Sequence, residues 1–303
     1  MSKTGHPPRR DRRVVASALA VALAAGGVYL ARGSDDPDAR THGALAVGEF
    51  PEPGVVHVHG LGVDPQDGTL YAATHSGLFR IPARGRASRV ANRYQDTMGF
   101  TVIGPRTFLG SGHPDLREDV PVRLGLIEST DAGETWTPLS LQGQADFHAL
   151  HAAHGNVYGY DSTSGSFMVS RDRRVWDTRS AQPMRDFVVS PSSPDTIVAT
   201  TDRGVLRSAD GGRSWQPLPR TPVLVVLAWQ RTTSLYGVTP DGTVLLSTDG
   251  GVRWTARGRV NGEPAAMTVD ARGSVETVYV AVAGRGILAS TDGGKTFNSR
   301  YSE

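Results

Sequence analysis

The motif Ser208-Ala209-Asp210-Gly211-Gly212-Arg213-Ser214-Trp215 indicates the fold, because the chain repeats it almost unchanged. The three other copies have Ser first, Asp third, Gly fifth and an aromatic residue eighth, and they span residues 129–136, 247–254 and 290–297. A motif that returns with the same residue types indicates a fold built from repeated units.

The spacing of the copies gives the length of the unit. Their aspartates are 79, 39 and 43 residues apart in chain order. The first gap is two periods long, and a degenerate copy at residues 170–176, one residue short and without the glycine, divides it into 41 and 38 residues. A sixth unit precedes them, since residues 76–80 read like residues 203–207. Six units of about 40 residues fall in the range of blade-type repeats.

Each unit has the pattern of short strands. Residues 187–189, 196–200, 204–207 and 214–218 are β-rich runs separated by turn residues. Four antiparallel strands per unit, repeated six times around an axis, make an all-β, six-bladed β-propeller. A solenoid is the competing repeat architecture, but every unit begins with an apolar strand, which suits a buried inner ring.

The repeated motif is the Asp-box pattern S-x-D-x-G-x-[ST]-W, and turn chemistry explains each of its residues. We place it between the third and fourth strands, where the Asp side chain accepts backbone N–H bonds and the glycine permits positive φ. The aromatic residue folds back to fill space between blades. The box aspartates are therefore predicted to be structural: Asp131, Asp210, Asp249 and Asp292.

The N-terminal region contains an uncharged segment at residues 14–30, with four arginines before it and three aspartates soon after it. Positive charge stays on the cytoplasmic side, so the propeller is predicted to be exported. We assign residues 1–32 to a basic cytoplasmic tail with a hydrophobic helix, residues 33–53 to a tether and residues 54–303 to the propeller. The helix is either a membrane anchor or a cleaved signal peptide, which leaves the propeller membrane-anchored or secreted.

Charge and cysteine content exclude two further classes. The chain has no cysteine, so it has no disulfide and no lipidated cysteine anchor. The pI of about 9.0 comes from the tail, because residues 33–303 contain 26 basic and 29 acidic residues, a net charge of −3. No nucleic-acid surface is expected, and we expect a monomer.

Propeller geometry directs the search for function to the face opposite the boxes. The first strand of each blade starts on that face and the second strand ends on it; we call it the mouth face. The starts of first strands there carry His57, His59, Asp96, Asp146, His148, Arg185 and Asp186. The ends of second strands carry His75, His113, Asp161, Asp202 and Arg285.

Histidine is concentrated on the mouth face. Seven of the nine histidines lie between positions 57 and 154, and five of these are assigned to the mouth. His57 and His59 are two apart on an expected strand, which predicts that their side chains point the same way. His151 is expected on the other side of its strand from His148, and His154 in a turn on the far face.

Neutral imidazoles that converge with a carboxylate suit zinc or another divalent transition metal. The candidate metal ligands are His59, His75, His113 and Asp146. The candidate ligand-binding residues are His57, His59, His75, His113, His148, Asp161 and Arg285, and the candidate catalytic residues are Asp96, Asp146 and Arg185. There are two alternatives. The mouth face could be a binding or catalytic site without a metal, or its histidines could be ordinary surface residues.

The sequence resembles a known family. Residues 57–65, 96–100 and 110–115 resemble phrases of exported actinobacterial Asp-box, or BNR-repeat, proteins that are labelled sialidase-like glycosylhydrolases. The resemblance covers about residues 43–299 and implies the propeller fold. The wider family includes sialidases, a photosystem II assembly factor and sortilin-type receptors.

The resemblance does not extend to a sialidase site. That family uses three arginines, a Tyr–Glu pair, an Asp acid/base and an F-R-I-P phrase on the first inner strand. This chain has Phe79-Arg80-Ile81-Pro82, but the repeats align Arg80 with Arg207 on a third strand. Arg185, Arg203 and Arg285 have positions that suit a carboxylate clamp, whereas Tyr160 is the only tyrosine near the mouth and no Glu is paired with it.

Three function classes remain open from the sequence. The first is a binding or assembly module for a glycan or envelope protein, attached to the membrane through the N-terminal segment. The second is a glycoside hydrolase of non-standard type, for which two mouth carboxylates are needed. The third is a metal-dependent enzyme on the same face. The binding module ranks first, because no complete catalytic set emerges.

Overall fold

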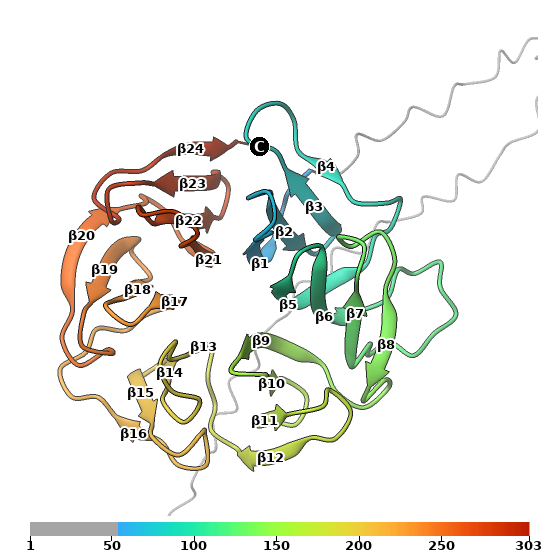
Figure 1. Ribbon diagram of the computed structural model, residues 1–303, viewed down its shortest axis with the longest axis horizontal. Helices are drawn as coiled ribbons and strands as arrows, with labels where there is room; N and C mark the ends of the chain where they lie inside the picture. Colours follow the sequence, from blue (N-terminus) through green and yellow to red (C-terminus); the bar gives the residue numbers. More distant parts are fainter. Residues whose placement is uncertain (1–53, 303) are drawn as a thin grey trace, which may run out of the picture. The chain divides into compact units, whose positions relative to one another are not determined.

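The computed structural model describes residues 54–302 and shows an all-β, six-bladed β-propeller (Figure 1). Its 24 strands form six four-stranded antiparallel sheets, each made from consecutive strands. The hydrophobic helix and tether predicted for residues 1–53 lie outside the described residues. Within residues 54–302 there is no helix, and hence none that could cross a membrane.

The first three blades hold strands β1 to β12. Blade 1 contains β1 (Val58–Val63), β2 (Leu70–Thr74), β3 (Gly77–Ile81) and β4 (Ser88–Arg89). Blade 2 contains β5 (Asp96–Gly104), β6 (Thr107–His113), β7 (Leu126–Ser129) and β8 (Thr137–Ser140). Blade 3 contains β9 (Phe147–Ala153), β10 (Asn156–Asp161), β11 (Ser166–Ser170) and β12 (Asp177–Ser180).

The last three blades hold strands β13 to β24. Blade 4 contains β13 (Asp186–Val189), β14 (Ile197–Thr201), β15 (Gly204–Ser208) and β16 (Gln216–Pro217). Blade 5 contains β17 (Val226–Arg231), β18 (Ser234–Val238), β19 (Thr243–Ser247) and β20 (Thr255–Arg259). Blade 6 contains β21 (Pro264–Asp270), β22 (Thr277–Val282), β23 (Gly286–Ser290) and β24 (Asn298–Tyr301).

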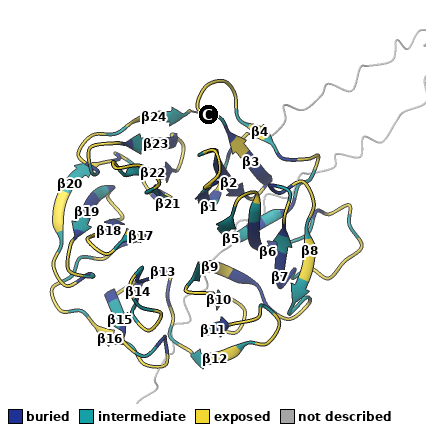
Figure 2. Ribbon diagram, viewed as in Figure 1, coloured by how far each residue is buried: buried dark blue, intermediate teal, exposed yellow. Residues whose placement is uncertain are grey.

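The hydrophobic core lies between neighbouring blades. Phe167 of blade 3 and Phe187 of blade 4 are both buried, and their rings meet edge to face with centroids 5.1 Å apart. Figure 2 shows second strands such as β2 and β14 almost wholly buried, and outer strands such as β8 and β20 more exposed. On β14, Ile197 packs in the cluster with blade 3 and Val198 packs in the cluster with blade 5, so successive apolar side chains fill the spaces on both sides of the blade.

The ring closes without a strand shared between the two ends of the propeller, because blades 1 and 6 are each continuous in sequence. Side chains make the junction instead. Arg300 of β24 donates hydrogen bonds to the carbonyl oxygens of Ile81 (2.9 Å) and Pro82. Val55, fully buried, packs in the same apolar cluster as Ile287 of blade 6.

The Asp boxes occupy the turns between third and fourth strands, as predicted. In blade 4, Ser208 Oγ donates to Asp210 Oδ1 at 2.8 Å and accepts the Gly212 N–H at 2.8 Å. Asp210 also accepts the Ser214 N–H at 2.9 Å and its hydroxyl at 2.6 Å. The Trp215 indole N–H donates to Ser180 Oγ of blade 3 at 2.9 Å, so the box joins two blades.

The degenerate box in blade 3 keeps part of this network. Asp172 Oδ1 accepts the N–H groups of Arg174 and Val175 at 2.9 and 2.8 Å. Arg173 has φ 63°, in the left-handed region that glycine favours. The Trp176 indole N–H still donates to Ser140 Oγ of blade 2 at 2.9 Å, so the contact between blades survives loss of the glycine.

The inner strands of all six blades surround a central cavity of about 810 Å³. Its wall includes His59, His148 and Asp186 near the starts of β1, β9 and β13, which is the mouth-face end of these strands. The fold therefore brings polar groups from different blades to one opening.

Candidate functional site

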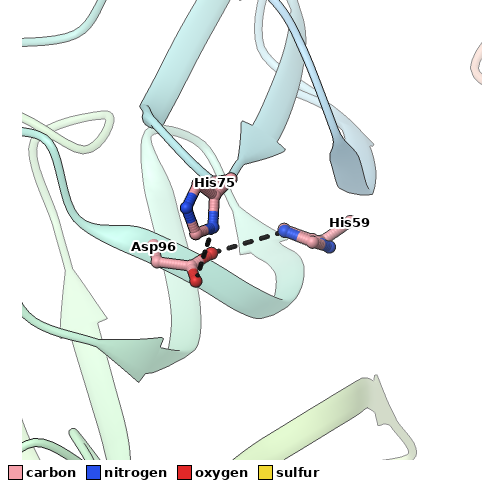
Figure 3. A group of neighbouring side chains, drawn as sticks. All are labelled: His59, His75 and Asp96. Atoms are coloured by element: carbon pink, nitrogen blue, oxygen red, sulfur yellow. Dashed lines mark hydrogen bonds and ion pairs between the residues drawn. The ribbon is translucent and has the colours of Figure 1, made fainter. Parts of the chain in front are cut away.

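Asp96 is the centre of a histidine cluster on the mouth face. It begins β5, while His59 comes from β1, His75 from the turn after β2 and His113 from the end of β6. Asp96 Oδ1 lies 3.3 Å from His59 Nε2, and Asp96 Oδ2 lies 2.9 Å from His75 Nδ1 and 3.4 Å from His113 Nδ1. Figure 3 shows His59 and His75 pointing at the carboxylate from two sides.

Asp146 is a second carboxylate beside this cluster. It directly precedes β9, and its Oδ2 lies 2.9 Å from His148 Nε2 and 3.5 Å from His113 Nε2. His113 therefore faces Asp96 with one ring nitrogen and Asp146 with the other. The structure brings together four of the five histidines assigned to the mouth.

Both carboxylates favour the ionised state. Burial alone would raise the pKa of Asp96, but its contacts with His59, His75 and His113 outweigh burial and lower the pKa. Burial likewise opposes ionisation of Asp146, and His148, His113 and a Ser162 hydrogen bond lower its pKa overall. The cluster thus offers anionic oxygen and imidazole nitrogen together.

This arrangement can bind a cation. One ligand atom each from His59, His75 and Asp96 lie within 4.8 Å of one another. His59 Nε2 and Asp96 Oδ1 are buried atoms that make no hydrogen bond among the described residues, although they lie 3.3 Å apart. Buried polar atoms usually have a partner, and a divalent transition metal takes this type of nitrogen and oxygen ligand.

The structure corrects the strand placement that was assumed for His57. Strand β1 starts at Val58, and its register shifts between Val58 and Gly60, so His59 lies at a bulge. His57 precedes the strand with φ 49°. Alternation along a strand therefore does not decide the directions of these two side chains. His57 is exposed and meets the cluster through the His75 ring, with centroids 6.4 Å apart.

Other predicted site residues have local partners. The carboxylate of Asp161 accepts the N–H groups of Asp146, Thr163 and Ser164 at 2.9, 3.1 and 3.3 Å, which holds a turn. Arg285 donates to the carbonyl oxygens of Val260 and Asn261 at 2.8 and 2.9 Å.

Arg185 does not join the histidine cluster. It pairs with Asp202 at 2.7 Å, and both side chains are largely exposed. The pair lies on the mouth face of blade 4, since Arg185 directly precedes β13 and Asp202 directly follows β14.

Asp186 has a property that the sequence did not reveal. Its two carboxylate oxygens accept the N–H groups of Phe187 and Leu227, both at 2.8 Å. Burial raises its pKa to about 7, against the lowering effect of these two hydrogen bonds. Asp186-Phe187 of blade 4 repeats the Asp146-Phe147 pair of blade 3. The sequence therefore predicted that the two aspartates occupy equivalent places, but not that the surroundings of their carboxylates differ.

The structure does contain a Tyr–Glu pair, but not at the mouth. The Tyr236 hydroxyl donates to Glu276 Oε2 at 3.2 Å. Tyr236 is buried, and burial together with Glu276 raises its pKa to about 12. A nucleophile requires the opposite shift. Arg80 lies on the third strand β3, as Arg207 does on β15, which confirms the register argument against a sialidase arginine.

Comparison with known proteins supports the fold. No protein-family model matches the chain, and no curated protein matches it in sequence. Similar solved structures include a GH74 xyloglucanase from Xanthomonas campestris, with 16% identity and TM-score 0.50 over 79% of this chain and 45% of that chain. An ancestral GH74 enzyme has 14% identity and TM-score 0.51 over 82% of this chain and 38% of that chain.

A chain of the nidogen/laminin complex is also similar, with 13% identity and TM-score 0.60 over 76% of this chain and 92% of that chain. The present chain spans less than half the length of the two GH74 structures. Identities this low show a shared β-propeller fold alone. The function must therefore be inferred from the candidate site.

Proposed function

We propose that this protein is an extracytoplasmic β-propeller module that binds a divalent transition-metal ion on its mouth face and uses this face to hold a glycan or envelope protein. The observation that supports the proposal is the convergence of His59, His75 and His113 on the ionised carboxylate of Asp96. Imidazole nitrogen with one carboxylate oxygen is a donor set suited to zinc.

The location and family are part of the proposal. The arginines before residues 14–30 support export, with the hydrophobic segment as anchor or signal peptide. The intact boxes support membership of the Asp-box, sialidase-like group, including its exported actinobacterial members. Membrane attachment would keep the module at the cell envelope.

Metal binding fits the cluster better than acid/base catalysis between its two carboxylates. A glycosidase needs one carboxylic acid with a raised pKa and one carboxylate. The pKa values of Asp96 and Asp146 are both lowered, since each carboxylate contacts histidines. Two ionised carboxylates lack the proton that a general acid must donate, whereas both of them attract a cation.

Metal analysis of untagged protein tests the proposal. The protein is stripped with a chelator, equilibrated with zinc and passed over a desalting column, and bound zinc is measured per chain. We expect at least one equivalent in the wild type and loss of that ion in the His59→Ala, His75→Ala double variant. Affinity should fall as the pH is lowered, because protonated imidazole does not coordinate.

His57→Ala is the matched control, because His57 is a neighbouring, exposed mouth histidine outside the Asp96 contacts. It should keep the bound zinc and the melting temperature of the wild type. A wild-type protein that retains no zinc, and whose melting temperature is unchanged by zinc, manganese or cobalt, would exclude the metal. Glycan and peptide arrays would then test the mouth as a metal-free binding face.

A glycoside hydrolase is the second candidate, because one observation favours it. Asp186 and Asp146 occupy equivalent places in neighbouring blades, and their pKa values are shifted in opposite directions. Such a pair can divide the roles of acid and base. Hydrolysis of a polysaccharide panel that is lost in Asp186→Asn, with zinc binding intact, would support this function over the binding module.

A further inference from the structure

We propose that the mouth face holds a second divalent cation beside the first, bound by Asp146, His148 and the Nε2 atom of His113. The inference rests on the proposed function for the first ion, at His59, His75 and Asp96, and extends it to a two-metal site. His113 is the ligand between the two positions.

The position of His113 is the first argument. Its Nδ1 lies 3.4 Å from Asp96 Oδ2 and its Nε2 lies 3.5 Å from Asp146 Oδ2. Both distances are longer than a usual N–H···O hydrogen bond of about 2.9 Å. The ring therefore stands between two carboxylates without a short bond to either, and each nitrogen faces a different carboxylate.

The burial of Asp146 is the second argument. The residue is only 6% exposed, and its Oδ1 has no hydrogen-bond partner among the described residues. Its Oδ2 contacts His148 Nε2 at 2.9 Å and accepts the Ser162 hydroxyl at 3.3 Å. A buried carboxylate with one unsatisfied oxygen is costly, and a cation bound at that carboxylate would offset the cost.

The number of ligands is the third argument. A transition-metal ion such as zinc takes three or four protein ligands. His59, His75 and Asp96 offer three atoms within 4.8 Å of one another, which already suffices for one ion. Asp146 and His148 remain, and their 2.9 Å contact places a second nitrogen–oxygen pair next to the first.

The backbone around Asp146 is fixed, as a pre-organised site requires. The Asp146 N–H donates to Asp161 Oδ1 at 2.9 Å, and its carbonyl oxygen accepts the Ser162 N–H at 2.9 Å. The next residue, Phe147, donates its N–H to Ser111 Oγ of blade 2 at 3.0 Å. These bonds give Asp161 a role as the support of a ligand rather than as a ligand.

Zinc stoichiometry of single-position variants tests the second site. Untagged full-length protein is stripped, loaded with zinc alone and analysed for zinc per chain, with circular dichroism to confirm folding. We expect two equivalents in the wild type, one in His148→Ala and one in the His59→Ala, His75→Ala variant. His113→Ala should weaken both ions, by about tenfold or more each, and His57→Ala should retain two.

The outcomes separate this inference from the proposed function. One equivalent in the wild type that His148→Ala leaves unchanged would overturn the second site and leave the first standing. Two equivalents that His148→Ala leaves unchanged would place the second ion elsewhere and also overturn it. A single equivalent that is lost both in His148→Ala and in the His59→Ala, His75→Ala variant would mean one shared site and would overturn the second site. A wild-type protein that binds no zinc would overturn both proposals. Cobalt loading adds an independent measure, because a change of the visible spectrum in His148→Ala identifies this histidine as a ligand.

Discussion

The two faces of the propeller use aspartate in opposite ways. On the box face, Asp210 and Asp292 accept a Ser hydroxyl at 2.8 and 2.7 Å and a second hydroxyl at 2.6 Å, so the same network recurs from blade to blade. On the mouth face, Asp96 and Asp146 contact histidines that have no counterpart in blades 4–6. Repeated contacts belong to the fold, and contacts that occur in one place are candidates for function.

The hydrogen-bond partners of the aspartates also differ between the two faces. Box aspartates bind hydroxyls and backbone N–H groups of their own turn, which lowers their pKa values and stabilises that turn. The mouth aspartates bind side chains from other strands and blades, and they leave buried oxygen atoms unsatisfied. Variants that change stability and metal binding separately would support this division between the two faces, and variants that change both equally would contradict it.

The largest expected effect is on stability and comes from the box face. In Gly212→Ala, the new Cβ would lie 2.2 Å from the Phe167 ring, at a residue with φ 91°. We expect the free energy of unfolding to fall by about 3–4 kcal/mol, from overlap in the core and backbone strain. Urea denaturation measures this change.

Gly250→Ala is the matched control for the box variant. Gly250 has φ 72°, a new Cβ there has its nearest neighbour at 3.4 Å, and Ala132 occupies the equivalent place in blade 2 with φ 68°. A loss of about 1 kcal/mol is expected from the backbone alone. Equal losses for the two variants would contradict the assignment of Gly212 to close packing between blades.

The next effect is on metal affinity and comes from the mouth face. Asp96→Asn replaces an anionic ligand with a neutral one, and we expect zinc affinity to fall about 100-fold, equivalent to ~2.7 kcal/mol. Asp210→Asn should leave zinc affinity unchanged and lower stability through the loss of its turn bonds. Isothermal titration with zinc and thermal unfolding distinguish the two aspartates, and a similar loss of affinity in both would remove the distinction between the faces.

A smaller effect concerns pH and Asp186. Its folded pKa of about 7 is raised above the unfolded value near 3.8, so the folded state binds the proton more tightly. Its contribution to stability is present below pH 4 and is lost as the pH rises through 7, a change on the order of 2 kcal/mol once partial exposure is allowed for. Asp186→Asn should remove this slope in unfolding experiments between pH 5 and 8. An unchanged slope would show that Asp186 is ionised in the folded protein.

The smallest effect is expected for the exposed pair on the mouth face. Arg185 and Asp202 have side chains that are 59% and 76% exposed. Exposed ion pairs contribute roughly 0–1 kcal/mol. Arg185→Ala should therefore change the unfolding free energy by less than about 0.5 kcal/mol and leave zinc affinity unaltered. A clear loss of affinity for a glycan or peptide in this variant would instead extend the binding site to blade 4.

The architecture could be predicted from the order of residues. Four boxes, a degenerate copy and the likeness of residues 76–80 to residues 203–207 predicted six blades of four strands. Turn chemistry is local, since each residue of the box acts within a few positions of its own turn. The same local logic placed Arg80 on a third strand and excluded it from a sialidase-type site. The mouth assignment of His59, His75, His113 and His148 also followed from strand order alone.

The pairing of these groups depends on contacts between strands and blades, which the order of residues does not show. The contacts of Asp96 join residues up to 37 positions apart from different strands, and a bulge after Val58 sets the place of His59. Asp146 and Asp186 are each followed by Phe, yet Asp146 meets His148 and the more distant His113, whereas Asp186 meets the backbone of the next blade. Their pKa values differ because burial and neighbouring charges act through space, and neither can be read from the order of residues.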